Sequence, residues 1–290
     1  VLGPRSWWPT VSPTVAGAAL GELTSYRELS GRPDAAVVSF PDAGMFILRT
    51  PAGDDREIWC RCDGGPHGFL SIAAHAHADA LSVEVRSKGV DLLVDPGTYC
   101  YHGEPAWRSY FRSTLAHNTI EVDGANQSVE GGPFLWSSCT DAVVDRVELG
   151  QRVQTWSGHH WGYARLDAQL RLDRSVAVDP DQRTVTVTDT LTGAARHTLR
   201  LAWQIGPEVR VSLTGGVARL AWLEDSTPRS GLLRLPEQLT WSAHSGETDP
   251  ILGWYSPRFG ERVPATTLIG TGTWNGVLRL QTVLDLADDA

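Results

Sequence analysis

The sequence predicts an all-β protein built as a large antiparallel two-sheet β-sandwich. The first observation behind this prediction is that short apolar or alternating runs recur from Ala35 onward, separated by turn residues, as expected of half-buried strands. The second is that no stretch after Ala35 keeps a 3.6-residue period for three turns, so helices do not alternate with strands as in an α/β fold. The runs are numerous enough to require two packed sheets.

Turn residues place these strands along the chain. Pro41-Asp42-Ala43-Gly44 and Arg86–Gly89 each lie between two apolar runs and predict hairpins, and Asp123-Gly124 ends a further run. The predicted strands are Ala35–Phe40, Met45–Arg49, Glu57–Cys62, Leu81–Val85, Val90–Val94, Thr119–Val122, Val143–Leu149, Val153–Trp156, Tyr163–Leu172, Thr184–Thr190, His197–Ile205, Val209–Leu213, Val217–Leu223, Leu239–Ala243, Thr267–Gly270 and Gly276–Val283.

The chain divides into a linker and one domain. Residues 1–34 are rich in Pro, Gly, Ser and Thr and predict a linker, within which Val15–Leu29 has the pattern of a short helix. Residues 35–290 form the predicted β-sandwich domain. The N-terminus has neither an initiator Met nor the features of a signal peptide, so we expect a piece of a longer protein whose compartment this end does not reveal.

Charge excludes some classes of function. The formal net charge is −9, and an acidic protein gains nothing from the phosphate electrostatics that drive nucleic-acid binding. A polyanionic substrate would need local clusters of Arg and His, because Lys88 is the only lysine. No apolar run approaches the roughly 20 residues that a membrane-spanning helix needs.

The four cysteines predict no dense disulfide framework. Cys60 and Cys62 alternate along a predicted strand and are expected to be buried thiols, while a bond between Cys100 and Cys139 stays open.

The segment His75-Ala76-His77-Ala78-Asp79 predicts a metal site. If it is a strand, its three polar side chains share one face, where unpaired imidazoles and a carboxylate would be costly to bury. Asp95 ends an apolar run and His117 starts another, so both are expected to find partners. Two imidazoles and one carboxylate suit zinc, with a fourth position for water or another group.

Other interpretations of this segment remain open. The histidines could lie on a solvated face. The HxHxD pattern is also similar to that of metallo-β-lactamase-like hydrolases, but Ala80 stands where those place a further ligand. Amidohydrolases carry HxH on a first barrel strand, yet no β/α alternation follows here. A metal-dependent hydrolase is therefore a weaker hypothesis.

Several blocks in order resemble one family. Residues 75–82 (HAHADALS) are followed by Asp95-Pro96-Gly97-Thr98-Tyr99, by Arg108–Thr114 and by Ala116-His117-Asn118-Thr119. Upstream lies Asp63-Gly64-Gly65-Pro66-His67-Gly68, and downstream lies Gly253–Gly260 (GWYSPRFG). Together, these blocks resemble the signature of heparinase II/III-like polysaccharide lyases, from about Asp42 to the end and most strongly over residues 63–136.

The resemblance implies an architecture and an activity. Members of this family join an N-terminal α/α toroid to a C-terminal sandwich of the galactose-mutarotase type, and they cleave uronic-acid polysaccharides by β-elimination. By this resemblance residues 1–34 are the end of the toroid or its linker, and the partners are an acidic polysaccharide and the toroid. The isolated chain is then expected to be weakly active or inactive. The substrate class favours a secreted or cell-envelope location.

The resemblance also implies residue roles. It places a mainly structural zinc ion on His77, Asp95 and His117, and a substrate-facing group at His75. We predict His75, Tyr99 and Arg112 as the catalytic residues of this chain. Tyr101, Tyr110, Arg108, Asn118 and Gln127 are further candidates for the cleft or its support, and Asp79 is a candidate to orient a ligand imidazole.

Structural interpretations of these residues stay open beside the catalytic ones. The tyrosines could belong to the core and the arginines to structural ion pairs. His159-His160 could form a solvated turn or a wall of a sugar cleft. A non-catalytic β-sandwich that binds carbohydrate or supports an interface is the alternative function.

Overall fold

The computed structural model describes residues 37–50, 57–68, 72–149 and 152–287, and these belong to a compact unit that spans residues 36–290. The linker and the helix pattern expected before Ala35 lie outside the described residues. The prediction of an all-β antiparallel sandwich is confirmed, since the paired strands among the described residues run antiparallel. No helix among the described residues is long and apolar enough to cross a membrane.

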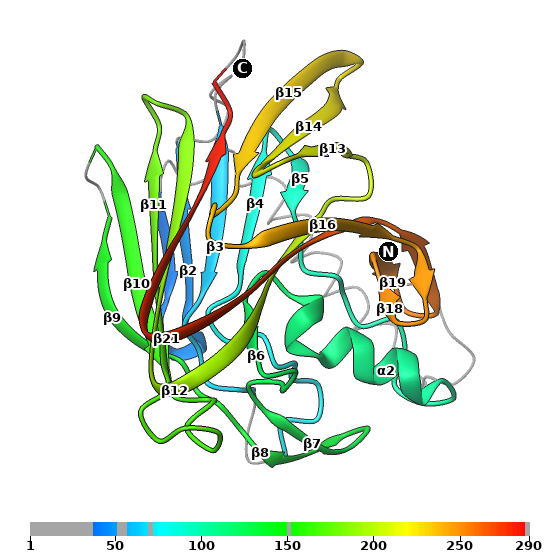
Figure 1. Ribbon diagram of the computed structural model, residues 1–290. Helices are drawn as coiled ribbons and strands as arrows, with labels where there is room; N and C mark the ends of the chain where they lie inside the picture. Colours follow the sequence, from blue (N-terminus) through cyan, green and yellow to red (C-terminus); the bar gives the residue numbers. More distant parts are fainter. Residues whose placement is uncertain (1–36, 51–56, 69–71, 150–151, 288–290) are drawn as a thin grey trace, which may run out of the picture. The chain divides into compact units, whose positions relative to one another are not determined.

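The strands are short except for two (Figure 1). Their bounds are β1 Val37–Phe40, β2 Met45–Arg49, β3 Ile58–Asp63, β4 Val83–Ser87, β5 Val90–Leu93, β6 Ile120–Val122, β7 Val129–Gly132, β8 Leu135–Ser138, β9 Val143–Glu148, β10 Gln154–His160, β11 Arg171–Asp179, β12 Thr184–Ile205, β13 Arg210–Thr214, β14 Val217–Glu224, β15 Thr227–Arg234, β16 Thr240–Ser245, β17 Glu247–Thr248, β18 Ile251–Leu252, β19 Trp254–Arg258, β20 Glu261–Pro264 and β21 Thr266–Asp285. The helical segments are η1 Pro41–Ala43, α2 Pro105–Arg112 and η2 Thr114–Ala116.

The two long strands join the layers of the sandwich. The first part of β12 pairs with β11, which continues through β10 to β9, whereas its last residue, Ile205, pairs with Leu93 of β5. Strand β5 continues through β4, β3 and β2 to β1. Strand β21 pairs with β12 along nearly its whole length. Strands β10 and β11 pack against β2 and β3 without pairing with them, so two sheets face each other across a core.

Strict alternation along the strands builds this core. In β11, for example, Leu172, Val176 and Val178 point inward and are buried, while their neighbours are more exposed. These side chains join one apolar cluster with residues of β2–β5, β10, β12, β14, β15 and β21. A smaller apolar cluster lies around α2, where Tyr99, Tyr110 and Phe111 meet Leu252 of β18.

Several predicted boundaries differ from the structure. The separate runs Thr184–Thr190 and His197–Ile205 belong to the single strand β12, which carries a bulge between Gly193 and Arg196. The runs Thr267–Gly270 and Gly276–Val283 likewise form β21. The predicted strand Tyr163–Leu172 is wrong over most of its length, because residues 162–169 form turns.

The segment His75–Asp79 is not a strand. Residues 72–82 form an irregular loop between β3 and β4, so the alternation expected there does not apply. The helix α2 was not predicted from the sequence, because it has only two turns. Pro105 occupies its first turn, where proline is tolerated, and Arg108 and Arg112 lie four residues apart on its buried side.

Candidate functional site

Four side chains meet beside the loop between β3 and β4. His77, Asp79, Asp95 and His117 each offer one ligand atom, and these atoms all lie within 4.8 Å of one another. Nδ1 of His77 is 3.1 Å from Nε2 of His117. The same Nε2 is 3.4 Å from Oδ2 of Asp95 and 4.0 Å from Oδ2 of Asp79. The three residues predicted as metal ligands therefore come together, with Asp79 as a fourth.

The four residues come from three segments of the chain. His77 and Asp79 come from the loop after β3, Asp95 follows β5, and His117 follows η2. Asp95 is fixed by its own turn, because Oδ1 accepts a hydrogen bond of 2.8 Å from the backbone N–H of Gly97. Gly97 has φ +82°, and a Cβ there would lie 2.5 Å from the carbonyl oxygen of Ser256, so this turn requires glycine.

Hydrogen bonding and burial leave both imidazoles able to act as ligands. Nδ1 of His117 lies 2.9 Å from the carbonyl oxygen of Ser113, so this nitrogen donates and Nε2 keeps its lone pair for the cluster. Burial, and then the proximity of His117, lowers the pKa of His77 well below its usual value and keeps this ring neutral. The backbone carbonyl of Ser113 thus has the orienting role that we expected of Asp79.

The carboxylates are crowded in the absence of a cation. Burial raises the pKa of Asp79 to about 7; His117 opposes this shift, whereas Asp63 and Asp95 add to it by charge repulsion. Placing carboxylates so close together is unfavourable unless a positive charge lies between them. The four residues thus form a site in which a divalent cation would relieve the repulsion.

The donor set fits zinc. In a tetrahedral site with ligands about 2.0–2.2 Å from the ion, the ligand atoms lie about 3.3–3.6 Å apart. The separations of 3.1, 3.4 and 4.0 Å around Nε2 of His117 bracket this value. Neutral imidazoles with carboxylates are also the ligand types that zinc accepts. Nε2 of His77 is buried and has no hydrogen-bond partner among the described residues.

Buried side-chain hydrogen bonds fix the positions of the segments that carry the candidate ligands. The side-chain amide of Asn118 donates to the carbonyl oxygens of Val83 (2.8 Å) and Val94 (3.0 Å), next to Asp95. Its oxygen accepts from the backbone N–H of Gln204 at 2.6 Å. Gln127 donates to the carbonyl oxygen of Ala80, next to Asp79, at 3.1 Å. Asn118 and Gln127, both candidates from the sequence, therefore fix the backbone next to Asp95 and Asp79.

His75 lies outside the cluster and faces solvent. Its Nδ1 is 3.1 Å from the hydroxyl of Tyr101, and the two rings meet edge to face with centroids 5.1 Å apart. The guanidinium of Arg108 lies over the ring of Tyr101, 5.2 Å from its centroid. The structure thus pairs the exposed histidine with Tyr101, and an imidazole bonded to a phenol can exchange protons with a ligand beside it.

Tyr99 has a different environment. It is buried, has φ +58°, and its hydroxyl is bonded to Glu104 and Arg262. The hydrogen bond to Glu104, followed by burial, raises the pKa of Tyr99. The structure gives Tyr99 the partners of a structural tyrosine, and its catalytic role stays a prediction that this geometry does not favour.

Arg112 is fully buried beneath the loop. Its Nη1 donates to the carbonyl oxygen of Gly132 at 2.9 Å, and its guanidinium stacks 4.1 Å from the ring centroid of Trp136. Its own carbonyl oxygen accepts from the backbone N–H of Ala78, next to His77. Neither Arg112 nor Arg108 pairs with a carboxylate among the described residues. This position suits support of the loop better than contact with a sugar.

Other features singled out in the sequence do not join the cluster. All four cysteines are free thiols, so no bond links Cys100 and Cys139. His159 and His160 are the last two residues of β10, so the solvated turn considered for them is wrong. Nδ1 of His159 is 2.9 Å from Asp145, and with Asp173 they form a second, more exposed group. His160 is buried and accepts a hydrogen bond from the N–H of Gly162.

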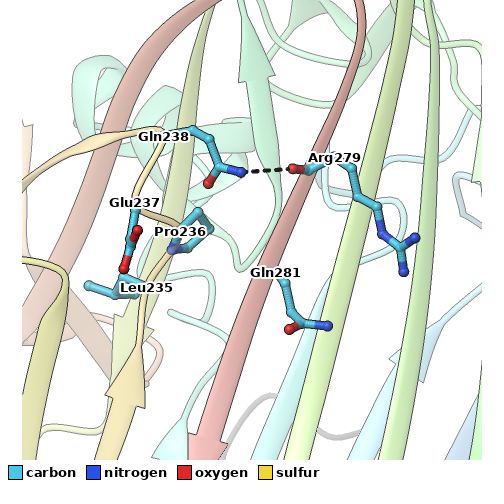
Figure 2. Close-up of a pocket in the computed structure, with 6 residues that line it drawn as sticks. All are labelled: Leu235, Pro236, Glu237, Gln238, Arg279 and Gln281. Carbon is cyan, nitrogen blue, oxygen red and sulfur yellow. Dashed lines mark hydrogen bonds between the residues drawn. The ribbon is translucent and has the colours of Figure 1, made fainter.

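An open hollow lies elsewhere on the domain. It has a volume of about 600 Å³ and lies between the segment after β15 and strand β21. Figure 2 shows that Gln238 bonds the backbone of Arg279 across it. It is a shallow, open groove without a histidine, so the chemistry is assigned to the cluster and not to this hollow; its lining is Leu235, Pro236, Glu237, Gln238, Arg279 and Gln281.

Sequence reasoning missed one important residue. Arg174 of β11 is fully buried, and its Nη1 donates to the carbonyl oxygens of Leu81 (2.8 Å) and Asn118. A signal was present: Arg174 occupies an inward position of an alternating strand, and Asp189 occupies an inward position of the next. Opposite charges at facing inward positions predict a buried ion pair.

Comparisons with known proteins agree with this fold. A family model described as Heparinase II/III-like, C-terminal, matches residues 32–279. No curated protein matches the chain. A solved structure named heparinase III-BT4657 gene product is 21% identical over 92% of this chain, with a TM-score of 0.72. The heparan sulfate lyase HepC from Pedobacter heparinus is 15% identical over 96% of this chain, also with a TM-score of 0.72.

The similarity to these structures is one of fold, and it covers only part of each of the larger proteins. The chain spans 40% of the length of the first structure and 42% of the second. The family model, by contrast, covers most of the chain, including the whole segment that carries the cluster. The protein therefore belongs to the heparinase II/III-like family and carries its C-terminal domain.

Proposed function

We propose that this chain is the sandwich module of a polysaccharide lyase that cleaves uronic-acid-containing polysaccharide by β-elimination. One observation supports this most strongly: the exposed His75 lies in the loop that carries His77 and Asp79, and its partner Tyr101 lies in the segment after β5 that carries Asp95. Membership of the heparinase II/III-like family supports the same reaction class.

The reaction sets clear requirements. Its base removes the C5 proton of a uronate, the electrons of that C–H bond form the C4–C5 double bond, and the C4–O4 bond breaks with its electron pair on O4. An acid then protonates O4. Neutralising the uronate carboxylate makes the C5 proton more acidic.

His75 and Tyr101 supply proton-transfer groups for this chemistry. His75 is exposed, so a sugar can reach its ring. The hydroxyl of Tyr101, held 3.1 Å from Nδ1, can pass a proton to or from that ring. We assign His75 the role of base or charge-stabilising group and Tyr101 that of its proton partner, and we leave Tyr99 and Arg112 as supporting residues.

The cluster is proposed to hold a structural zinc ion. His77, Asp95 and His117 would bind it, with Asp79 as a fourth ligand. Such an ion would fix the loop that carries His75, because His77 is two residues away. By the family resemblance, an α/α toroid would supply the remaining catalytic groups and the other wall of the cleft, with residues 1–34 as its end or linker.

The experiment that tests this function uses the whole natural protein, including any segments outside these 290 residues. It is mixed with alginate-like and glycosaminoglycan-like polymers, and the absorbance of the 4,5-unsaturated product is followed. Accumulation of that chromophore supports the lyase. Saturated ends would indicate a hydrolase, and binding without product would indicate a carbohydrate-binding module.

A further inference from the structure

Three aromatic rings from three distant segments meet at the surface, where Tyr101 contacts both Phe134 and Phe259. Tyr101 follows β5, Phe134 lies in the turn between β7 and β8, and Phe259 lies in the turn between β19 and β20. The centroid of Tyr101 is 5.7 Å from that of Phe134 and 5.3 Å from that of Phe259, with interplanar angles of 42° and 38°. We call these three residues the aromatic strip.

The fold does not explain why the aromatic strip is exposed. Phe134 is 39% exposed and Phe259 is 64% exposed, and both stand at hairpin turns, where Gly, Asn, Asp and Pro are the usual residues. Exposed aliphatic side chains such as Leu223 and Val277 are ordinary for a protein surface. Two exposed rings that both contact the half-buried Tyr101 form a contiguous aromatic surface, which is typical of a binding site.

The polar surroundings indicate the kind of ligand. Tyr101 connects the aromatic strip to His75 through the 3.1 Å contact, and Arg108 lies over its ring. His102, the next residue along the chain, is exposed. Arg258 also adjoins Phe259, but Glu261 pairs with it. Arg108 forms no ion pair among the described residues, so its positive charge beside Tyr101 favours an anionic ligand, in a chain whose net charge is −9.

We propose that the aromatic strip is a binding subsite for an anionic oligosaccharide, on which pyranose rings stack beside His75. A pyranose has an apolar face of C–H groups that packs on an aromatic ring and a rim of polar groups that needs hydrogen-bond or charged partners. The aromatic strip offers the surface on which the C–H face packs, and His75, His102 and the hydroxyl of Tyr101 offer partners for the polar rim. The identity of the ligand as a uronate polymer rests on the proposed function.

Calorimetric titration of the 290-residue protein with uronate hexasaccharides of alginate and heparan type tests this subsite. Phe134→Ala and Phe259→Ala should each weaken binding about 3- to 10-fold, the equivalent of one aromatic contact. Phe259→Tyr keeps the ring and should bind like the wild type. Leu223→Ala and Val277→Ala remove exposed apolar side chains outside the aromatic strip and should leave the affinity unchanged.

Several outcomes would overturn the subsite. These are a wild-type protein that binds neither hexasaccharide, alanine variants that bind as tightly as the wild type, or control variants that weaken binding equally. Alanine variants that alter only self-association, measured by sedimentation, would show that a second copy occupies the aromatic strip. Weakened binding without any unsaturated product from the whole protein would refute the lyase and keep the subsite.

Discussion

Arg174 and Asp189 form a fully buried ion pair behind the candidate metal centre. Nε of Arg174 is 2.7 Å from Oδ1 of Asp189, and Nη2 is 3.1 Å from Oδ2. The remaining nitrogen, Nη1, donates to the backbone of Leu81 and Asn118, which follow Asp79 and His117 closely in the sequence. One guanidinium therefore ties the two segments that carry three of the four clustered residues.

Breaking this pair should destabilise the protein and loosen the site. Arg174→Met leaves the Asp189 carboxylate buried without a partner, and such a loss costs about 3–5 kcal/mol. We also expect metal affinity to fall about 10- to 100-fold, as when outer-shell support of a ligand is lost. Urea unfolding and competition with a chelating dye measure the two effects.

Arg171→Met is the matched control for Arg174→Met. Arg171 lies on the same strand and pairs with Asp173, but both side chains are about one-third exposed, so the change should cost about 0–1 kcal/mol and leave metal affinity unaltered. Equal loss of metal affinity in both variants would show that Arg174 has no special link to the site.

His117→Ala should lower metal content and thermal stability together. The substitution removes the imidazole closest to the other three ligand atoms, and metal binding that occurs only in the folded state adds to its stability. Elemental analysis should find bound metal falling from about one ion per chain towards zero. His159→Ala, at the second and more exposed group, is the control and should retain the ion. A His117→Ala protein with full metal content would contradict the ligand assignment.

His75→Ala should lower turnover without changing metal content or stability. His75 lies outside the cluster, so the variant should keep its metal and its unfolding temperature while turnover by the whole protein falls about 10²- to 10⁴-fold. Tyr101→Phe should keep the aromatic ring and lose much of the turnover. Product formation at the wild-type rate in His75→Ala would remove this histidine from the mechanism.

The pH dependence of the unfolding free energy should reveal the charge of His197 in the folded state. Its burial alone would lower the pKa, but its hydrogen bonds to Asp123 and Asp167 raise it above the usual value. A group with a raised pKa stabilises the folded state fully below its unfolded pKa, about 6.5, and this contribution is lost as pH rises through the raised value. The two carboxylates, whose pKa values are lowered, contribute above their unfolded pKa and lose that contribution in acid.

Substitution of His197 tests this linkage. The difference in unfolding free energy between the wild type and His197→Gln should be greatest between about pH 4 and 6.5, because only there are the contributions of the imidazole and of the carboxylates both complete. It should shrink as pH rises through the raised pKa of His197. Unfolding in urea across a pH series measures it. A difference that stays constant from pH 5 to pH 9 would show that His197 is not charged in the folded state.

The sequence predicts most of the strands because their apolar residues alternate. It fails where a glycine has a packing role. Gly270 looks like a strand end, yet a Cβ there would lie 2.5 Å from the indole of Trp241, so glycine makes room for a ring within the continuous strand β21. Helix α2 is not predicted from the sequence because its two turns are too short to give a periodic pattern.

The candidate site also has residues that the sequence predicts and residues that it does not. His77, Asp95 and His117 follow from motif resemblance, since each stands in a recognisable block. The membership of Asp79 depends on the path of an irregular loop, which alternation does not describe. The pairing of His75 with Tyr101 and not with Tyr99 is a contact between distant segments, and the spacing of the two tyrosines in the sequence does not distinguish them.

Anomalous diffraction recorded on both sides of the zinc absorption edge tests the central claim most directly. Crystals of protein purified without added metal should give one strong peak, present only above the edge, within about 2.0–2.2 Å of ligand atoms from His77, Asp95 and His117. A peak at another place, or no peak between these side chains after zinc has been supplied, would contradict the metal centre.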